Sequence, residues 1–207
     1  MLRDVGRGTR EVEVVAHAGV FDPHYSVRKG DSGGRPRYAG LPFSRQALEG
    51  EGAVFRLIEG PTDISDCALL TGEVPRLTSF ERVAESLKLP NGEGWVPDPV
   101  FDDQALVVRT GEGLVVVLGC AHSGMINTLQ YARRIAGEER ILAVVGGTHL
   151  GPAPREQLEE TIEALRAFGV RKLGVSHCTG FAAAARLAQE FGDAFFFNVV
   201  GTVTELP

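Results

Sequence analysis

Apolar and polar positions follow two different patterns along this chain, and the clearer pattern begins at Ala105. From there, short apolar runs typical of β-strands alternate with longer stretches whose apolar residues recur every three or four positions. The strand-like runs are 105–109, 114–119, 141–146, 172–176 and 194–200, and the helical stretches are 124–136, 154–168 and 180–191. This alternation predicts neighbouring, largely parallel strands with the helices covering a face of the sheet.

The first half of the chain is richer in glycine, proline and charge, and it predicts strands over 11–17, 53–59 and 67–72. Residues 22–44 show little of either the helical or the strand periodicity. Because compact domains seldom keep so long a loop without a use, we expect a lid or a binding surface there. The proline-rich segment 89–104 is predicted to be a second connecting loop. The length of 207 residues favours a single domain, 1–207, with a substantial core.

Composition and charge narrow the class of protein. The apolar fraction of 43% and the charged fraction of 23% are typical of a soluble globular protein. No apolar run is long enough to cross a membrane, and the N-terminal sequence MLRDVGRGTR lacks the apolar segment of a signal peptide, so we expect a cytoplasmic location. A formal net charge of −6 without a basic run argues against a nucleic-acid partner. Three cysteines, Cys67, Cys120 and Cys178, make a disulfide framework unexpected.

Three histidines occupy the same place in successive structural units. His122, His149 and His177 each lie within three residues of the end of a predicted strand, and one helix and one strand separate each from the next. Because ligand-binding residues gather where such strands end, the three imidazoles are expected to meet. Imidazole is a good ligand for zinc, iron and related ions, and three ligands with an open position form a hydrolytic arrangement. A bound ion lowers the pKa of a coordinated water to about 7.

The residues also allow other interpretations. Each histidine taken alone is more often a loop residue that is hydrogen-bonded to the backbone. Cys120 and Cys178 lie beside the predicted ligands, but without CxxC spacing we favour small buried residues over metal ligands. Thr179 and Gly180 begin a helix whose free N–H groups can hold a phosphate or carboxylate, although an ordinary N-cap is the commoner role of such a threonine.

Several segments, in order and spacing, resemble the metallo-β-lactamase superfamily. They are VVAHAGVF (14–21), LLTGEVPRLTSFE (69–81), DDQAL (102–106), GCAHSG (119–124), GGTHL (146–150) and HCTG (177–180). The similarity is greatest to the branch that includes the dihydropterin ribofuranosyl-aminobenzene-phosphate synthase-like proteins. It implies an α+β fold with α/β-like character, a four-layer αββα sandwich with metal at the edge of its two sheets. His122, His149 and His177 then correspond to the third, fourth and fifth metal motifs.

One hallmark of that superfamily, H-x-H-x-D-H, has no counterpart in this sequence, which contains no H-x-H. The resemblance therefore implies a fold that lacks its N-terminal part and its carboxylate ligands. We expect one divalent ion, zinc before iron or manganese, held more weakly than in a complete relative. Missing strands would leave an unpaired sheet edge, which favours a homo-oligomer or a complex with a chain that supplies the absent part.

The resemblance implies a metal-dependent hydrolase in which metal-bound hydroxide attacks an ester or phosphoester. Its substrate is expected to be a small anionic molecule. Arg76 can hold an anionic group through its guanidinium fork, or it forms a surface ion pair. Glu73 lies in the same family-like segment, and Tyr38 with the 22–44 loop is expected to help form a pocket. The alternative is a non-catalytic binding or assembly module that retains the fold but has lost part of its metal site.

Overall fold

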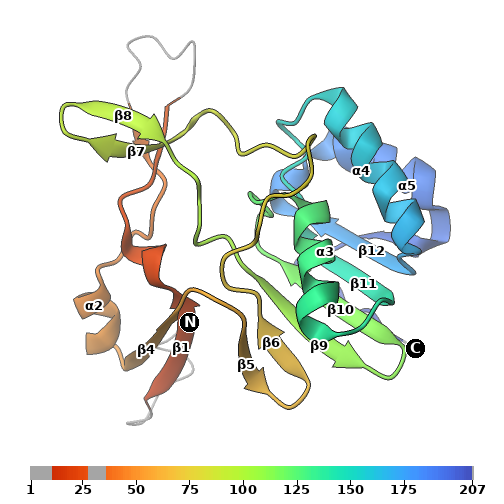
Figure 1. Cartoon of the computed structure of the whole chain (residues 1–207), viewed down its shortest axis with the longest axis horizontal. Coiled ribbons are helices and arrows are strands. Elements are labelled where there is room, and N and C mark those ends of the chain that lie inside the picture. The colour runs from red at the N-terminus through yellow and green to blue at the C-terminus, as the bar shows by residue number, and fades with distance from the viewer. Residues whose placement is uncertain (1–10, 28–35, 207) are drawn as a thin grey trace. The chain divides into compact units, whose positions relative to one another are not determined.

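The computed structural model describes residues 11–27 and 36–206, which fall into two compact units (Figure 1). The N-terminal unit comprises the described residues of Met1–Glu59 together with Glu85–Asp102. The sheet unit comprises Gly60–Ala84 and the described residues from Asp103 onward. The expectation of a single domain over 1–207 stays a prediction.

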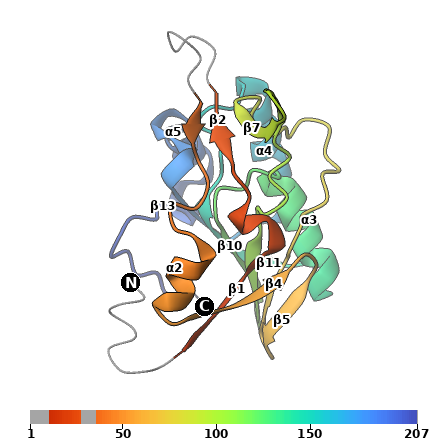
Figure 2. The ribbon, with the colours of Figure 1, turned by 90° about the vertical axis from the view of Figure 1, so that its left-hand side faces the viewer.

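The N-terminal unit contains a small parallel pair of strands, β1 (Val12–His17) and β4 (Ala53–Ile58), which lie side by side in Figures 1 and 2. Helix α2 (Arg45–Gly50) precedes β4, and the Ser44 hydroxyl caps it by accepting the Ala47 N–H at 3.2 Å. A 3-10 turn, η1 (Ala18–Phe21), follows β1 directly.

A second sheet of this unit has the strand order β3-β2-β7-β8. Its strands are β2 (Tyr25–Ser26), β3 (Arg37–Tyr38), β7 (Leu87–Asn91) and β8 (Gly94–Pro97). The prediction of a connecting loop over 89–104 is wrong in its first part, because β7 and β8 form an antiparallel hairpin there. The two residues of the turn are Gly92 and Glu93, and Gly92, at φ 58°, supplies the backbone conformation that such a tight turn needs. Of the predicted loop 22–44, residues 28–35 lie outside the described residues.

The sheet unit is built on a seven-stranded sheet with the order β13-β12-β11-β10-β9-β6-β5. Its strands are β5 (Thr62–Ser65), β6 (Ala68–Leu70), β9 (Ala105–Thr110), β10 (Gly113–Leu118), β11 (Ile141–Gly147), β12 (Lys172–Ser176) and β13 (Phe195–Phe197). The strands from β10 to β13 are parallel, whereas β5, β6, β9 and β10 pair antiparallel. The predicted run of parallel strands is therefore confirmed.

Three helices connect the parallel strands: α3 (Met125–Ala136), α4 (Arg155–Phe168) and α5 (Phe181–Phe191). The strand order advances in one direction from β10 to β13, and right-handed crossovers then place all three helices on the same face. Leu129 of α3, Leu165 of α4 and Leu187 of α5 are fully buried against the sheet in one core cluster. The sequence predicted each of these helices to within one residue at its start.

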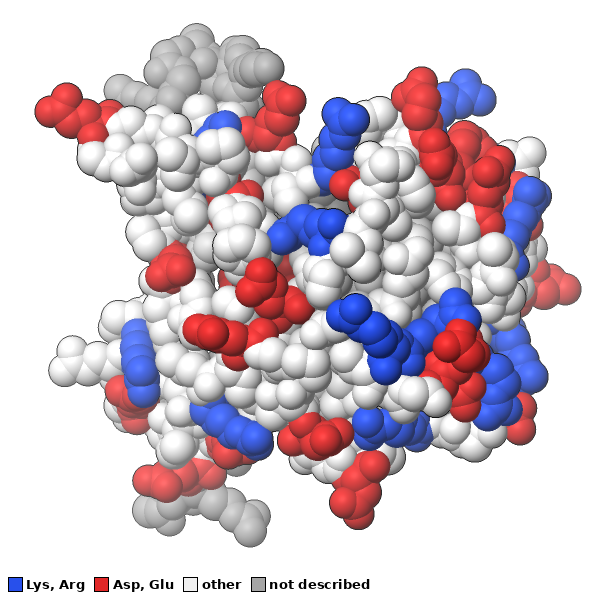
Figure 3. Space-filling model, in the orientation of Figure 1, with Lys and Arg blue, Asp and Glu red and all other residues white. Residues whose placement is uncertain are grey.

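The surface over these helices carries charges of both signs. On the face shown in Figure 3, Lys and Arg side chains alternate with Asp and Glu side chains there rather than forming one basic patch. None of the helices in the described part of the chain combines the length and the apolar character needed to cross a membrane. The expected cytoplasmic location stays a prediction.

Candidate metal centre

Three loops meet at the carboxyl ends of β10, β11 and β12, because these neighbouring strands run parallel. Each loop contains a non-glycine residue with left-handed backbone: Ala121 at φ 56°, His149 at φ 51° and His177 at φ 54°. Such a conformation is uncommon outside glycine and persists only where the surroundings determine it, which is frequent at functional sites. The three predicted histidine motifs therefore share a backbone feature that the sequence did not reveal.

His122 and His149 are neighbours in the structure. Their ring centroids are 4.2 Å apart with the planes tilted by 52°, and both side chains are half-buried. Both ring nitrogens of His149 are shielded from solvent and form no hydrogen bond of good geometry with the described residues. Buried polar atoms normally have partners, so this imidazole is placed where a ligand or ion would satisfy it.

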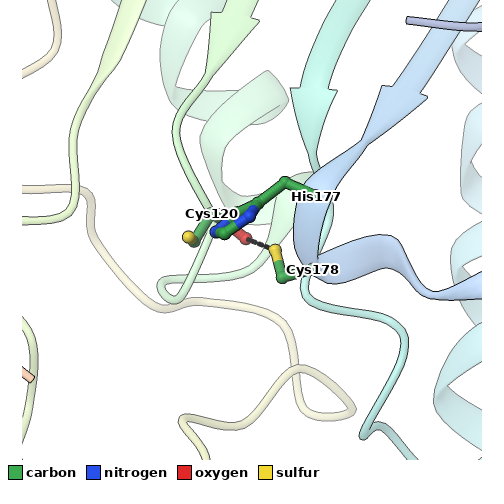
Figure 4. A group of neighbouring side chains, drawn as sticks. All are labelled: Cys120, His177 and Cys178. Carbon is green, nitrogen blue, oxygen red and sulfur yellow. Dashed lines mark hydrogen bonds between the residues drawn. The ribbon is translucent and has the colours of Figure 1, made fainter. Parts of the chain in front are cut away.

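His177 lies in a second group, with Cys120 and Cys178 (Figure 4). The ring nitrogen of His177 and the two Sγ atoms all lie within 4.8 Å of one another. The Cys178 Sγ accepts the His149 backbone N–H at 3.2 Å and donates to the Cys120 carbonyl at 3.5 Å. The prediction of small buried cysteines is wrong about burial, because both are half-exposed and their sulfurs lie close to the His177 ring.

The pKa values of the two thiols are shifted in opposite directions. The hydrogen bond between the pair, with further help from His149, lowers the pKa of Cys178 well below that of an ordinary thiol. The same hydrogen bond, together with burial, raises the pKa of Cys120. Cys178 is therefore the thiol that ionises first, and a thiolate is the form that binds metal.

The structure thus brings His122 beside His149 and places His177 with the two cysteines. His149 joins the groups, because its ring contacts that of His122 and its N–H binds Cys178. The assignment of the three histidines as a common ligand set stays a prediction. A cysteine within two residues of a histidine, in two of the three loops, is the sequence signal for these sulfur atoms, and it does not depend on CxxC spacing.

Glycines of β11 allow the outer loops to approach each other. A Cβ atom on Gly147 would lie 2.5 Å from the Gly119 carbonyl oxygen and 2.9 Å from the Cys178 Sγ. The neighbouring Gly146, at φ 131°, would bring a Cβ to 2.2 Å from the Leu118 oxygen. These positions have no space for a side chain, so the close contact of the loops depends on glycine.

A buried carboxylate fixes the loop that carries His122. Glu81 is 7% exposed, and its two oxygens accept the Ile126 and Asn127 N–H groups at 2.7 and 2.8 Å. It therefore caps helix α3, whose N-cap residue Gly124 has no side chain to do so. Burial raises the pKa of Glu81, although its hydrogen bonds act in the opposite direction.

The predicted substrate-binding residues occupy different positions. Arg76 is half-buried and its Nη2 donates to the Ser123 hydroxyl at 3.3 Å, which places the guanidinium one residue from His122. The Ser123 N–H in turn binds the Asp103 carboxylate at 2.8 Å, a residue the sequence had not singled out. Glu73 is exposed. The roles assigned to Arg76 and Glu73 stay predictions.

The other predicted contacts lie elsewhere. The Thr179 side chain is 1% exposed and its hydroxyl binds the Ser176 carbonyl and the Thr148 hydroxyl, so it holds the loop together. Gly180 is the N-cap of α5 and lines, with His177, a cavity of about 620 Å³. Tyr38 belongs to the N-terminal unit, where its hydroxyl donates to the Leu41 carbonyl at 3.0 Å. These substrate contacts also stay predictions.

The N-terminal unit has a histidine network of its own. His24 Nδ1 lies 2.6 Å from Asp98 Oδ2, while Nε2 lies 3.3 Å from the Gly19 oxygen and 3.7 Å from Asp102 Oδ2. Burial lowers the pKa of His24, but the hydrogen bond to Asp98 and the charges of both aspartates outweigh it, so the pKa is raised. The charged ring therefore links three segments of this unit.

This network predicts pH-dependent stability. Because the folded pKa of His24 is raised, the charged ring stabilises the fold fully below its unfolded pKa, near 6.5, and this contribution is lost as pH rises through the folded pKa. We expect the stability difference between the wild type and His24→Gln to be largest at acidic pH and to shrink as pH rises. Urea denaturation of both proteins at a series of pH values, from acidic upward, measures this difference. A stability difference that does not change with pH would contradict the prediction.

Comparisons with known proteins agree with the fold. No family model matches the chain. A crystal structure of a metal-dependent hydrolase of the β-lactamase superfamily superposes with a TM-score of 0.81 and 27% identity, over 100% of this chain and 74% of that one. An uncharacterised protein of Methanocaldococcus jannaschii is 28% identical over 92% of this chain and 67% of its own length.

The chain has the metallo-β-lactamase fold, which it shares with that metal-dependent hydrolase of the β-lactamase superfamily. The chain is also similar to the 7,8-dihydropterin-6-methyl-4-(β-D-ribofuranosyl)-aminobenzene-5′-phosphate synthase of Methanocaldococcus jannaschii, at 40% identity over 108 residues. That match covers 52% of this chain and 36% of the synthase, so the chain aligns with about a third of that relative.

The residues at the strand ends fit a divalent metal ion, which the likeness to a metal-dependent hydrolase implies. Imidazole nitrogens and thiolate sulfurs are the donors that zinc and similar ions prefer. The ring nitrogens of His149 are buried and form no hydrogen bond of good geometry within the described residues. The donor chemistry and the position of this ring therefore agree with a metal centre.

Proposed function

We propose that this protein is a metal-dependent hydrolase that acts on small anionic esters or phosphoesters. The observation that supports it most is the gathering of histidine and cysteine donors from three separate loops at the ends of β10, β11 and β12. Three independent segments converge on one edge of a sheet, which is where α/β folds bind their ligands. The superfamily relationship supplies the general type of chemistry.

Zinc is the ion we propose, with iron or manganese as substitutes, and His122, His149 and His177 as residues that hold it. A bound divalent ion supplies an activated water at neutral pH. These three imidazoles are neutral ligands, so they contribute no negative charge to offset that of the ion. We therefore propose a single ion, bound more weakly than in a carboxylate-containing site.

Neighbouring residues would bind and orient the substrate. Arg76, beside Ser123, offers a guanidinium for the anionic group, and a guanidinium fork matches a carboxylate or phosphate. Asp103 holds the Ser123 N–H and so fixes the loop on which His122 lies. The free N–H groups at the start of α5, next to Gly180, offer a second place for negative charge.

The proposal is tested on the purified full chain by metal analysis and hydrolysis of bis(p-nitrophenyl) phosphate and p-nitrophenyl acetate. We expect about one zinc per chain, loss of hydrolysis with a chelator, and recovery with added zinc. The double variant His122→Ala/His177→Ala should lose the metal and at least about 100-fold of the rate. Arg76→Ala should slow hydrolysis of the anionic phosphodiester but not of the neutral acetate ester. Arg109→Ala is the matched control, because Arg109 forms its ion pair with Asp63.

The contrary outcome is a metal-free protein whose double variant behaves as the wild type. Such a result, together with a stable oligomer and no turnover, would instead support a binding or assembly module. Association with another chain remains our proposal for the assembly, and multi-angle light scattering during gel filtration measures it. A monodisperse monomer with turnover would contradict that association.

A further inference from the structure

We infer that Cys120, His177 and Cys178 form a thiolate-containing site for a thiophilic divalent ion such as zinc or cadmium. This inference rests on the proposed metal dependence; it keeps His177 and takes the sulfurs of Cys120 and Cys178, rather than the rings of His122 and His149, as the other donors. The sequence favours cysteines without ligand function, so the sulfur donors are an addition from the structure. Their close approach is what the structure adds (Figure 4).

The spacing of the three donor atoms is close to what a metal requires. In a tetrahedral zinc site, with Zn–S about 2.3 Å and Zn–N about 2.0 Å, two ligand atoms lie about 3.3 to 3.8 Å apart. The donor atoms of Cys120, His177 and Cys178 all lie within 4.8 Å of one another. We therefore expect rotation of these side chains to bring the donors to the spacing of a bound ion.

The backbone around Cys120, His177 and Cys178 allows the two cysteine loops to approach each other closely. Gly147, on the strand between the two cysteine loops, has no room for a Cβ, which would lie 2.9 Å from the Cys178 Sγ and 3.2 Å from the Cys120 Cα. His177 has left-handed backbone, at φ 54°, and begins the 3-10 turn η2 (His177–Thr179) that carries Cys178. A strained residue and a packed glycine both act to hold the three donors together.

The hydrogen bonds of Cys178 also suit a metal ligand. Its sulfur accepts the His149 backbone N–H at 3.2 Å, and a thiolate bound to metal keeps such a bond. Bonds of this kind orient the ligand and tune the metal. The weaker bond from Cys178 to the Cys120 carbonyl, at 3.5 Å, needs the thiol proton and would be lost as metal replaces that proton.

A set of two sulfurs and one nitrogen selects the ion. Soft thiolates favour zinc and cadmium over manganese or magnesium, which prefer oxygen ligands. Three protein ligands leave a fourth position of a tetrahedral ion open, as in catalytic zinc sites. The described group contains three donors, so it is compatible with a substrate or water at the remaining position.

Cobalt(II) spectroscopy of the full chain tests this donor set. Thiolate ligands give Co²⁺ intense near-ultraviolet charge-transfer absorption, which nitrogen and oxygen ligands do not give. We expect this absorption in the wild type, roughly half of it in Cys120→Ser and in Cys178→Ser, and full intensity in Cys67→Ser. Cys67 is the matched control because it is exposed and belongs to the turn between β5 and β6.

A second measurement uses the wild type alone and so does not depend on the folding of a variant. Zinc or cadmium should protect Cys120 and Cys178 from iodoacetamide while Cys67 still reacts, as read by peptide mass spectrometry. Binding of Co²⁺ without charge-transfer absorption, and alkylation unaffected by zinc, would overturn the sulfur site but leave the metal-dependent hydrolase standing. Absence of any bound metal would overturn both.

Discussion

Replacement of Gly147 by Ala is expected to lower the free energy of unfolding by about 3 kcal/mol and to weaken metal binding strongly. The added methyl group would lie 2.5 Å from the Gly119 oxygen and 2.9 Å from the Cys178 Sγ. The carbonyl belongs to the backbone, which accepts the Gly147 N–H at 3.0 Å, so it cannot move aside without loss of that bond. Urea denaturation and zinc titration measure the two effects.

Gly119→Ala is the matched control for this prediction. It lies in the neighbouring loop, and a Cβ there would meet nothing within 4 Å. We expect it to change stability by no more than about 0.5 kcal/mol and to retain zinc. Equal behaviour of the two variants would show that the close approach of the loops is unimportant for the site.

Glu81→Ala is expected to destabilise the sheet unit by about 3 kcal/mol. Truncation leaves the Ile126 and Asn127 N–H groups at the start of α3 without their acceptor in a buried place. It also loosens the loop that carries His122, because Gly124 lies against the Glu81 side chain. The binding of zinc should therefore weaken together with stability, and Glu81→Gln should show a smaller effect because it keeps one acceptor oxygen.

Glu160→Ala serves as the control, since Glu160 is an exposed residue of helix α4. We expect a change within about 0.5 kcal/mol there. If Glu81→Ala unfolds at the same urea concentration as this control, the carboxylate does not hold the loop. If stability falls but zinc binding is unchanged, Glu81 supports the helix without positioning His122.

These variants address one physical feature, the support of the strand-end loops. The donors lie on loops, and a side chain on a loop is held only as well as the groups beneath it. Gly147 permits the approach of the two cysteine loops, and Glu81 fixes the start of α3 behind His122. A metal site with weakly held ligands loses affinity, because the ion must then order the ligands as it binds.

The sequence predicted the regular part of the fold well. Leu158, Ile162 and Leu165 recur at helical spacing, and the structure places them on the side of α4 that faces the core. Continuous apolar runs such as 141–146 predicted buried parallel strands, and β11 is one. The hairpin of β7 and β8 does not follow from the proline-rich composition of 89–104, because Pro90 and Pro97 are typical of loops, and the tight turn at Gly92 and Glu93 is the signal that indicates it.

The sequence by itself determined where strands end and helices begin, and hence that His122, His149 and His177 all lie at one edge of a sheet. Periodicity depends only on residues close together in the chain, so it can be identified from the sequence. Only the tertiary structure decided that His177 lies with Cys120 and Cys178 while His122 lies against His149. That grouping depends on strand register, on glycines without room for a side chain, and on left-handed loop residues, none of which follow from the order of residues alone.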